Sequence, residues 1–288
     1  LSEGALPSTA PQSLQNIQRA GNPWGLPAAE RLAWADGLDV PRMEEGKEVE
    51  YLYWVGCSAS YDKRNQAIAR AVVKILKSAG VSFGVMQEER CHGEVARRLG
   101  EEYLYQTVQQ ENVQAIGRYR FKKVITHCPH CFNTLKNEFP QFGGTWEVLH
   151  HSVVIQELIA SGRIRPTKAL PVTVAFHDSC YLGRYNGIME APRAVARSVP
   201  GVRLIELPRN RERGLCCGGG GGHMWMEVKS QKRVNVIRVE EALEAKPDVV
   251  GTACPFCLAM VDLGRKVVGA EERLAVKDVS ELVADSLE

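Results

Sequence analysis

The sequence predicts an α/β protein made of two internally duplicated, Rossmann-like halves with parallel sheets. One observation is that apolar, strand-like runs alternate with helical patterns, which is typical of parallel strands joined by crossover helices. The other is a repeat of cysteines. Cys57 recurs as Cys180 after 123 residues, Cys91 recurs as Cys216 after 125, and both cysteines of "CPHC" recur in "CPFC" after 126. Four matching offsets indicate an internal duplication.

The first half begins with the apolar run "VEYLYWVGCSAS". A helix is expected over residues 65–80, because apolar residues recur at i, i+3 and i+4 and Gly80 follows them. A strand over 81–86 then leads to Cys91. A helix over 94–116 and a strand over 122–127 lead to "CPHC".

The second half repeats this order, starting from "VTVAFHDSC". A helix is expected around residues 191–199 and a strand over 202–207, followed by the loop "CCGGGGG". A helix over 231–245 and a strand over 248–253 then lead to "CPFC". We expect residues 49–165 and 166–288 to form the two halves. Residues 1–48 are expected to be a linker or a partner-binding N-terminal arm, with an ordered extension as the alternative.

Parallel sheets place their binding sites beyond the carboxyl ends of the strands. The cysteines follow strand-like runs, so each half should carry its cysteines on one rim of its sheet. The duplication further predicts that the halves face each other about a pseudo-two-fold axis.

Composition excludes several classes of protein. The apolar fraction of 44% is normal for a globular chain. A net charge of +2 without a long basic run does not suggest binding to nucleic acid or anionic membranes. No apolar stretch approaches the roughly 18 residues of a membrane span, and the first residues do not resemble a signal peptide. Since the chain begins with Leu1, we expect a fragment of a longer protein or a processed product.

Nine cysteines in such a chain favour metal or cluster binding in a reducing, cytoplasmic compartment. The second half carries five thiols, whereas tetrahedral zinc takes four ligands. Iron–sulfur clusters use thiolates and share sulfur among several irons. The glycines after the "CC" pair can adopt positive φ and bend around an inorganic core, and their amides can donate to its sulfides.

Two other interpretations fit less well. A phosphate cradle needs a strand–glycine–helix context, which the glycine run lacks. A thioredoxin-like dithiol would not explain why the CxxC motif occurs twice beside other cysteines.

The motif C…CCG…CxxC, present twice over residues 50 to 267, resembles the CCG-domain iron–sulfur oxidoreductases. These include the cysteine-rich subunits of heterodisulfide reductase and the iron–sulfur oxidoreductases linked to electron-transfer flavoprotein. The resemblance implies that a complete motif binds a non-cubane [4Fe–4S] cluster through five cysteines. The second half matches at every position: Cys180, Cys216, Cys217, Cys254 and Cys257.

The first half departs from this pattern, because His92 stands where the second cysteine of the pair should be. Its four remaining thiols are Cys57, Cys91, Cys128 and Cys131. Three outcomes stay open. The four thiolates hold an ordinary cubane [4Fe–4S] cluster, they hold a structural zinc, or His92 is itself a ligand.

The resemblance implies an oxidoreductase module that passes electrons between a flavoprotein or ferredoxin-type donor and a quinone or thiol/disulfide acceptor. The alternatives are a zinc-stabilised assembly scaffold without redox activity and a direct disulfide reductase. Expected partners are other redox subunits, including a membrane quinone-reactive one, through which the chain would reach a membrane. No catalytic residue is assigned. His127, His130, His177 and His223 are expected to serve the scaffold or to donate to cluster sulfur, and Arg184 to lie near the second cluster or in a surface salt bridge.

Overall fold

The chain folds around two parallel sheets of identical topology. The computed structural model describes residues 9–226 and 232–288. In strand order the first sheet is β2-β1-β3-β4 and the second is β6-β5-β7-β8, and every pairing is parallel. The first strand of each half lies inside its sheet with later strands on both sides. This order confirms the predicted fold class and places a topological switch point beside β1 and beside β5.

The strands of the first sheet are β1 (Glu48–Trp54), β2 (Phe83–Gly84), β3 (Arg120–Thr126) and β4 (Val148–His150). Those of the second are β5 (Thr173–Phe176), β6 (Arg203–Glu206), β7 (Val249–Thr252) and β8 (Ala275–Asp278).

The α-helices of the N-terminal arm and first half are α1 (Ala10–Ala20), α2 (Gly56–Tyr61), α3 (Gln66–Ser78), α4 (Glu94–Arg98), α5 (Glu102–Ile116), α6 (Pro129–Asn133) and α7 (His151–Ala160). Those of the second half are α8 (Cys180–Gly183), α9 (Glu190–Arg197), α10 (Val234–Glu244), α11 (Pro255–Val267) and α12 (Val279–Ser286). Short helical segments are η1 (Ala28–Ala35), η2 (Thr134–Glu138), η3 (Phe139–Phe142), η4 (Arg211–Arg213) and η5 (His223–Trp225).

Three elements differ from expectation. The helix expected over 94–116 is broken into α4 and α5, because Gly100 adopts a φ of 83° that ends the first turn. The strand expected over 81–86 pairs with β1 only at Phe83 and Gly84. The helix expected from residue 231 begins at Val234, and residue 231 itself lies outside the described residues.

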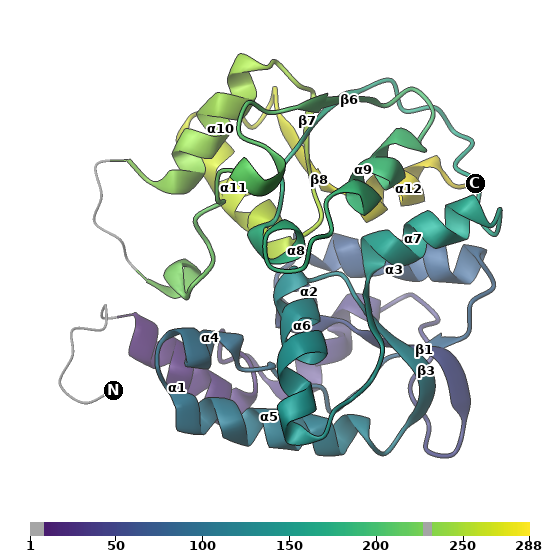
Figure 1. Ribbon diagram of the computed structural model, residues 1–288, viewed down its shortest axis with the longest axis vertical. Helices are drawn as coiled ribbons and strands as arrows, with labels where there is room; N and C mark the ends of the chain where they lie inside the picture. The colour runs from purple at the N-terminus through teal and green to yellow at the C-terminus, as the bar shows by residue number, and fades with distance from the viewer. Residues whose placement is uncertain (1–8, 227–231) are drawn as a thin grey trace.

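The halves pack through helices that lie between the two sheets (Figure 1). Helix α3 of the first half contacts α12 of the second, and α7 contacts α9 and α12. One continuous apolar core includes residues of both halves, such as Leu76 and Leu282. Polar ties reinforce this contact, because Arg64 donates to both carboxylate oxygens of Glu281 at 2.9 and 3.0 Å. The relative placement of the halves is therefore set by a large shared core.

Residues 9–48 lie on the first half. The apolar face of α1, formed by Ala10, Leu14 and Ile17, packs in one cluster with Leu104 and Val108 of α5. Segment η1 lies against α2, and Trp34, fully buried, belongs to the main core. Whether this arm also binds a partner stays a prediction.

A search for helices with the length and apolarity of a membrane span found none within residues 9–226 and 232–288.

The α12 N-terminus offers a test of the interface between the halves. Asp278 is fully buried, caps α12 through Ser280 and accepts from His151 Nε2 of α7 at 2.8 Å. We expect Asp278→Ala to lower the free energy of unfolding by about 2–4 kcal/mol, because a cap is lost and a buried imidazole loses its partner. Chemical denaturation measures this.

The control for this test is Asp285→Ala on the same helix, where the half-exposed carboxylate pairs with Lys277. It should change stability by no more than about 0.5 kcal/mol. Equal effects of the two substitutions would contradict an interface role for Asp278.

Candidate functional site

The nine cysteines assemble in two sets, one beside each sheet. Cys57 follows β1, and Cys128 follows β3 on the other side of the switch point. Cys180 and Cys254 follow the equivalent strands β5 and β7. The remaining cysteines follow β2 and β6 or lie one turn into a helix: Cys91, Cys131, Cys216, Cys217 and Cys257. Seven of the nine are buried, and Cys180 and Cys216 are partly exposed.

In the second half, five thiols lie near enough to one another that each shifts the pKa of its neighbour. The order is Cys180, Cys216, Cys217, Cys257 and Cys254. Cys254 is the N-cap of α11 and Cys257 its third residue, so both lie beside the free N–H groups of the first helical turn. The chain of contacts shows that the sequence-predicted ligands of this half all meet.

The glycine loop is shaped as the sequence predicts. Gly218 and Gly222 have φ values of 85° and 82°, which L residues with a side chain rarely adopt. The amide of Gly218 donates to Cys216 Sγ at 3.2 Å. The glycines therefore turn the loop so that an N–H group points at a cysteine sulfur.

A histidine completes the second set. The His177 ring nitrogen, Cys217 Sγ and Cys257 Sγ all lie within 4.8 Å of one another. Arg238 Nε donates to His177 Nδ1 at 2.9 Å, so the neutral ring carries its proton on Nε2. Burial, and then the charge of Arg238, lower the pKa of His177 to about 3. The neutral ring therefore has one N–H available beside the thiols.

In the first half, the four thiols line one small enclosed cavity. Cys57 and Cys91 lie near enough to shift each other's pKa, and Cys128 raises the pKa of Cys131 in addition to burial. The two pairs approach at Gly56, where a Cβ would lie 3.0 Å from Cys131 Sγ.

An arginine of the N-terminal arm contacts this first set. Arg31, 2% exposed, donates to Cys57 Sγ at 3.4 Å and to Glu89 Oε1 at 2.8 Å. Glu89 in turn accepts from the amides of Val55 and Gly56, which lead into Cys57. Burial opposes ionisation, but the Cys91 hydrogen bond and the Arg31 charge lower the pKa of the Cys57 thiol to about 6. The sequence motifs give no sign of this cation, because Arg31 lies far from every cysteine along the chain.

His92 also lines the first cavity. It is 6% exposed, and its Nδ1 has no hydrogen-bond partner among the described residues. Burial lowers the pKa of His92 to about 4, so the ring is neutral near pH 7 and has a free lone pair. His92 therefore occupies the sequence position of the missing cysteine, and the lone pair of its neutral ring could coordinate a metal ion.

The donor sets suit polynuclear clusters better than a single small ion. Within the described chain, no three sulfurs of the first set lie within 4.8 Å of one another. A single zinc would draw its ligands closer, since Zn–S bonds are about 2.3 Å long. Four soft thiols around a cavity in one half, and five in the other, fit iron–sulfur clusters.

Aromatic rings fill the space between the two sets. The His130 ring of "CPHC" packs at a tilt against Tyr181, with ring centroids 4.3 Å apart, and against Phe256 of "CPFC" at 4.8 Å. Phe256 also lines the cavity of the first set. The two CxxC loops therefore meet directly.

A second group of buried histidines lies at the same interface, and the sequence did not reveal it. His127 Nδ1 bonds Tyr53 Oη at 2.7 Å, and His150 lies against the carbonyls of His127 and Ala253, each the residue before a CxxC motif. His151 Nε2 bonds Asp278 Oδ1 of the second half at 2.8 Å, so this group of histidines connects the two halves. His150 and His151 were assigned no role from sequence, because no motif surrounds them.

Two predicted contributors lie at the surface. The Arg184 side chain is exposed and donates to the carbonyl of Gly214 at 3.1 Å. His223 is exposed, beyond the glycine loop.

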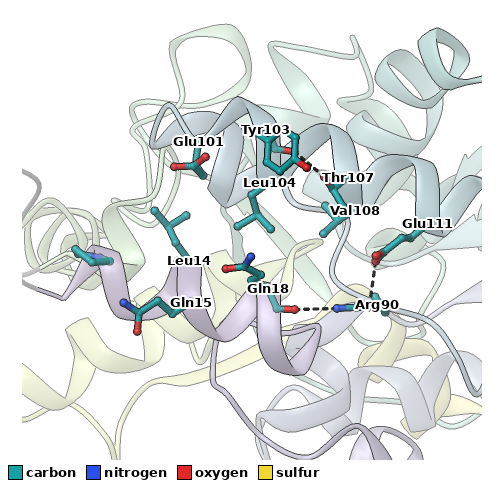
Figure 2. Close-up of a pocket in the computed structure, with 11 residues that line it drawn as sticks. Leu14, Gln15, Gln18, Arg90, Glu101, Tyr103, Leu104, Thr107, Val108 and Glu111 are labelled. Atoms are coloured by element: carbon teal, nitrogen blue, oxygen red, sulfur yellow. Dashed lines mark hydrogen bonds and ion pairs between the residues drawn. The ribbon is translucent and has the colours of Figure 1, made fainter. Parts of the chain in front are cut away.

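A separate open cavity of about 630 Å³, with no cysteine in its lining, lies between α1 and α5 (Figure 2). Its lining is mixed: Leu14 and Leu104 are apolar, while Arg90 pairs with Glu111 at 3.0 Å across its end. Arg90 and Glu111 neutralise each other, while Gln15, Gln18 and Glu101 also line the cavity.

Comparison with known proteins relates both halves to one family. The sequence profile of the cysteine-rich domain CCG matches residues 51–136 and again residues 174–262. The chain is 45% identical to the probable iron-sulfur-binding oxidoreductase FadF of Bacillus subtilis, over 100% of the chain and 42% of the relative. It is 42% identical to the EtfAB:quinone oxidoreductase of Syntrophomonas wolfei, over 99% of the chain and 42% of the relative.

A more distant relative is a subunit of the dihydromethanophenazine:CoB–CoM heterodisulfide reductase of Methanosarcina barkeri, 32% identical over 92% of the chain and 65% of the relative. The chain thus spans less than half the length of the two relatives above and 65% of this one. Among solved structures, a hypothetical protein from Helicobacter pylori matches with a TM-score of 0.53 and 8% identity, over 85% of this chain and 50% of that one. That likeness concerns the fold alone.

The buried pair of Arg31 and Glu89 provides a test of the first set. We expect Arg31→Met to lower the free energy of unfolding by about 3–5 kcal/mol, because Glu89 would keep its burial and lose its counter-charge. The loss should be smaller at pH 5 than at pH 8, since burial already raises the pKa of Glu89 to about 7 and a protonated carboxyl needs no partner. Denaturation at both pH values measures it.

Lys47→Met is the matched control, because the Lys47–Glu44 pair is more than half exposed. Its effect should stay within about 0.5 kcal/mol at either pH. An Arg31→Met loss no larger than this would show that the pair contributes nothing to the site.

Proposed function

The chain belongs to the family of cysteine-rich CCG-domain proteins, and on that premise we propose that it is the electron-transfer module of an iron–sulfur oxidoreductase. It passes electrons between a flavoprotein or ferredoxin-type donor and a quinone or thiol/disulfide acceptor. The observation that carries the proposal is the convergence of five thiols in one half and four in the other. The names of the relatives, an iron-sulfur-binding oxidoreductase, an EtfAB:quinone oxidoreductase and part of a heterodisulfide reductase, support the same class of reaction.

The second half would hold a non-cubane [4Fe–4S] cluster through five thiolates: Cys180, Cys216, Cys217, Cys254 and Cys257. The first half would hold a [4Fe–4S] cluster through four thiolates: Cys57, Cys91, Cys128 and Cys131. Such clusters, when bound, supply reversible one-electron chemistry whose potential depends on charge, hydrogen bonds and solvent exposure.

The residues around the two sites differ in charge, and they should therefore affect the reduction of each cluster differently. Arg31 puts a buried positive charge against Cys57, which favours a more negative, reduced first site. The second site has neutral donors, since Gly218 N–H contacts Cys216 and His177 presents Nε2–H beside Cys217. The partly exposed Cys180 and Cys216 lie at the outer edge of the second site. Electrons exchanged with a partner would pass this edge.

A relay fits the space between the sites better than direct disulfide reduction. The rings of His130, Tyr181 and Phe256 pack there in mutual contact. A disulfide that reached both sites would have to displace them, whereas an electron can cross them without any movement. The donor, the acceptor and the other redox subunits belong to the whole protein, of which this chain matches a part. We propose that the module acts in a reducing, cytoplasmic compartment and that any contact with a membrane is made through a partner.

The proposal is tested by metal analysis of anaerobically purified protein. We expect about eight irons, a matching amount of sulfide and no stoichiometric zinc, with visible and paramagnetic-resonance signals from both halves. Cys217→Ser should remove the second-half signal and about four irons while leaving the first-half signal. A colourless protein with zinc and no sulfide would instead identify a structural scaffold.

Substitution of His92 tests which residues hold the cluster of the first half. We expect His92→Cys to change the first-half spectrum, because a fifth thiolate enters the cavity that the other four line. The second-half spectrum should not change. His92→Ala is the companion variant: loss of the first-half cluster in it would mean that the imidazole is itself a ligand, whereas retention would leave four thiolates as the complete set.

A further inference from the structure

His177 directly follows β5, and its side chain is fully buried. Its backbone N–H donates to the Gly251 carbonyl of β7 at 2.8 Å, so the second sheet holds the residue in place. One of its ring nitrogens, Cys217 Sγ and Cys257 Sγ lie within 4.8 Å of one another. A histidine and two thiols at this spacing could bind one metal ion. Whether the ring is a ligand therefore depends on which of its nitrogens carries the proton.

An arginine of α10 determines the position of that proton. Arg238, 1% exposed, donates from Nε to His177 Nδ1 at 2.9 Å. A guanidinium has no acceptor atom and does not lose its proton in proteins, so Nδ1 presents its lone pair and the neutral ring is protonated on Nε2. A proton on Nδ1 would place two N–H groups face to face. While this hydrogen bond is made, Nε2 has no lone pair for iron.

The arginine is itself held in place by other contacts. Arg238 Nη1 donates to Glu241 Oε2 at 2.9 Å and to the Arg209 carbonyl at 3.0 Å. Glu241 is buried and also accepts from the Arg209 amide at 3.0 Å. These contacts use Nη1 of the guanidinium and leave its Nε–H group for the histidine.

The N–H group of the His177 ring lacks an acceptor. Nε2 is buried and has no hydrogen-bond partner among residues 9–226 and 232–288. A buried donor without an acceptor destabilises a folded protein. The sulfur atoms of a cluster held by the second set of thiols would supply acceptors beside this ring.

We propose that Arg238 is a positioning residue that keeps the proton of His177 on Nε2, so that the ring donates a hydrogen bond to sulfur of the second site and does not bind its iron. This inference rests on the function proposed above. A donor on cluster or ligand sulfur withdraws electron density and stabilises the reduced state. The arginine of α10 would in this way raise the reduction potential of the second site without touching it.

The first test asks whether the ring binds iron. Protein with isotopically labelled nitrogen in its histidines is reduced, and pulsed paramagnetic resonance is recorded on the second-half signal, which Cys217→Ser identifies. We expect only the weak nitrogen coupling of a hydrogen-bonded ring. A strong coupling from a directly bound nitrogen that His177→Phe removes would overturn the proposal.

The second test is a redox titration. His177→Phe removes the donor, and we expect the reduced-to-oxidised ratio of the second-half cluster to fall about tenfold at a fixed potential, which is about 59 mV for one electron. Arg238→Lys keeps the charge but lacks the Nε–H group that faces Nδ1, and it should lower the ratio about threefold. Added to His177→Phe, Arg238→Lys should change the ratio less than about 1.5-fold, because the ring through which it acts is gone.

Arg209→Lys is the control, because this half-exposed arginine pairs with the same Glu241 carboxylate and lysine keeps its charge. It should change the ratio less than about 1.5-fold. An Arg238→Lys effect that is equal with and without the His177 ring would contradict the proposal. If His177→Phe loses its second cluster, Arg238→Lys still decides: a fall relative to Arg209→Lys supports the proposal, and an unchanged ratio overturns it. Absence of iron and sulfide from the wild-type protein would instead refute the proposed function itself.

Discussion

The gathering of four thiols in one half and five in the other is the constraint on which the rest of the structure depends. Thiols that are buried side by side gain little from packing and repel one another once ionised. Each set is accordingly surrounded by groups that hold its sulfurs: the Gly218 amide and His177 in one half, Arg31 in the other. The sheets bring the loops together because β1 and β3, like β5 and β7, flank a switch point.

The interface between the halves forms part of both sites. The core that joins α3 to α12 fixes the distance between the sheets, and the CxxC loops meet above it. The rings of His130 and Phe256, one from each CxxC motif, lie 4.8 Å apart between centroids, so the two loops pack against each other. A duplicated chain can in this way build two unequal sites, because each site is completed by the half that did not supply its cysteines.

The N-terminal arm is a further reason why the two sites differ. Helix α1 and segment η1 have no counterpart in the described part of the second half, and they lie over the first site. The start of α1 also reaches the second half, because Thr9 Oγ1 donates to the Trp225 carbonyl at 2.8 Å. Through Arg31 and the Gly21 carbonyl, which accepts from the Cys91 amide at 2.7 Å, the arm reaches the first set of thiols. The first site is therefore closed and charged, while the second has an edge at Cys180 and Cys216 that faces outward.

The sequence by itself determined the α/β class, the duplication and the identity of all nine converging cysteines, because local periodicity and the repeat of a rare residue are visible without a structure. The departure at His92 was visible for the same reason. Only the tertiary structure decided which residues surround the thiols. Arg31, Glu89, Arg238 and His150 reach the sites through contacts between segments far apart in the chain, and such contacts leave no local pattern. The break at Gly100 and the crossing of His130 and Phe256 between halves likewise depend on how the packed elements meet, which no single stretch of sequence encodes.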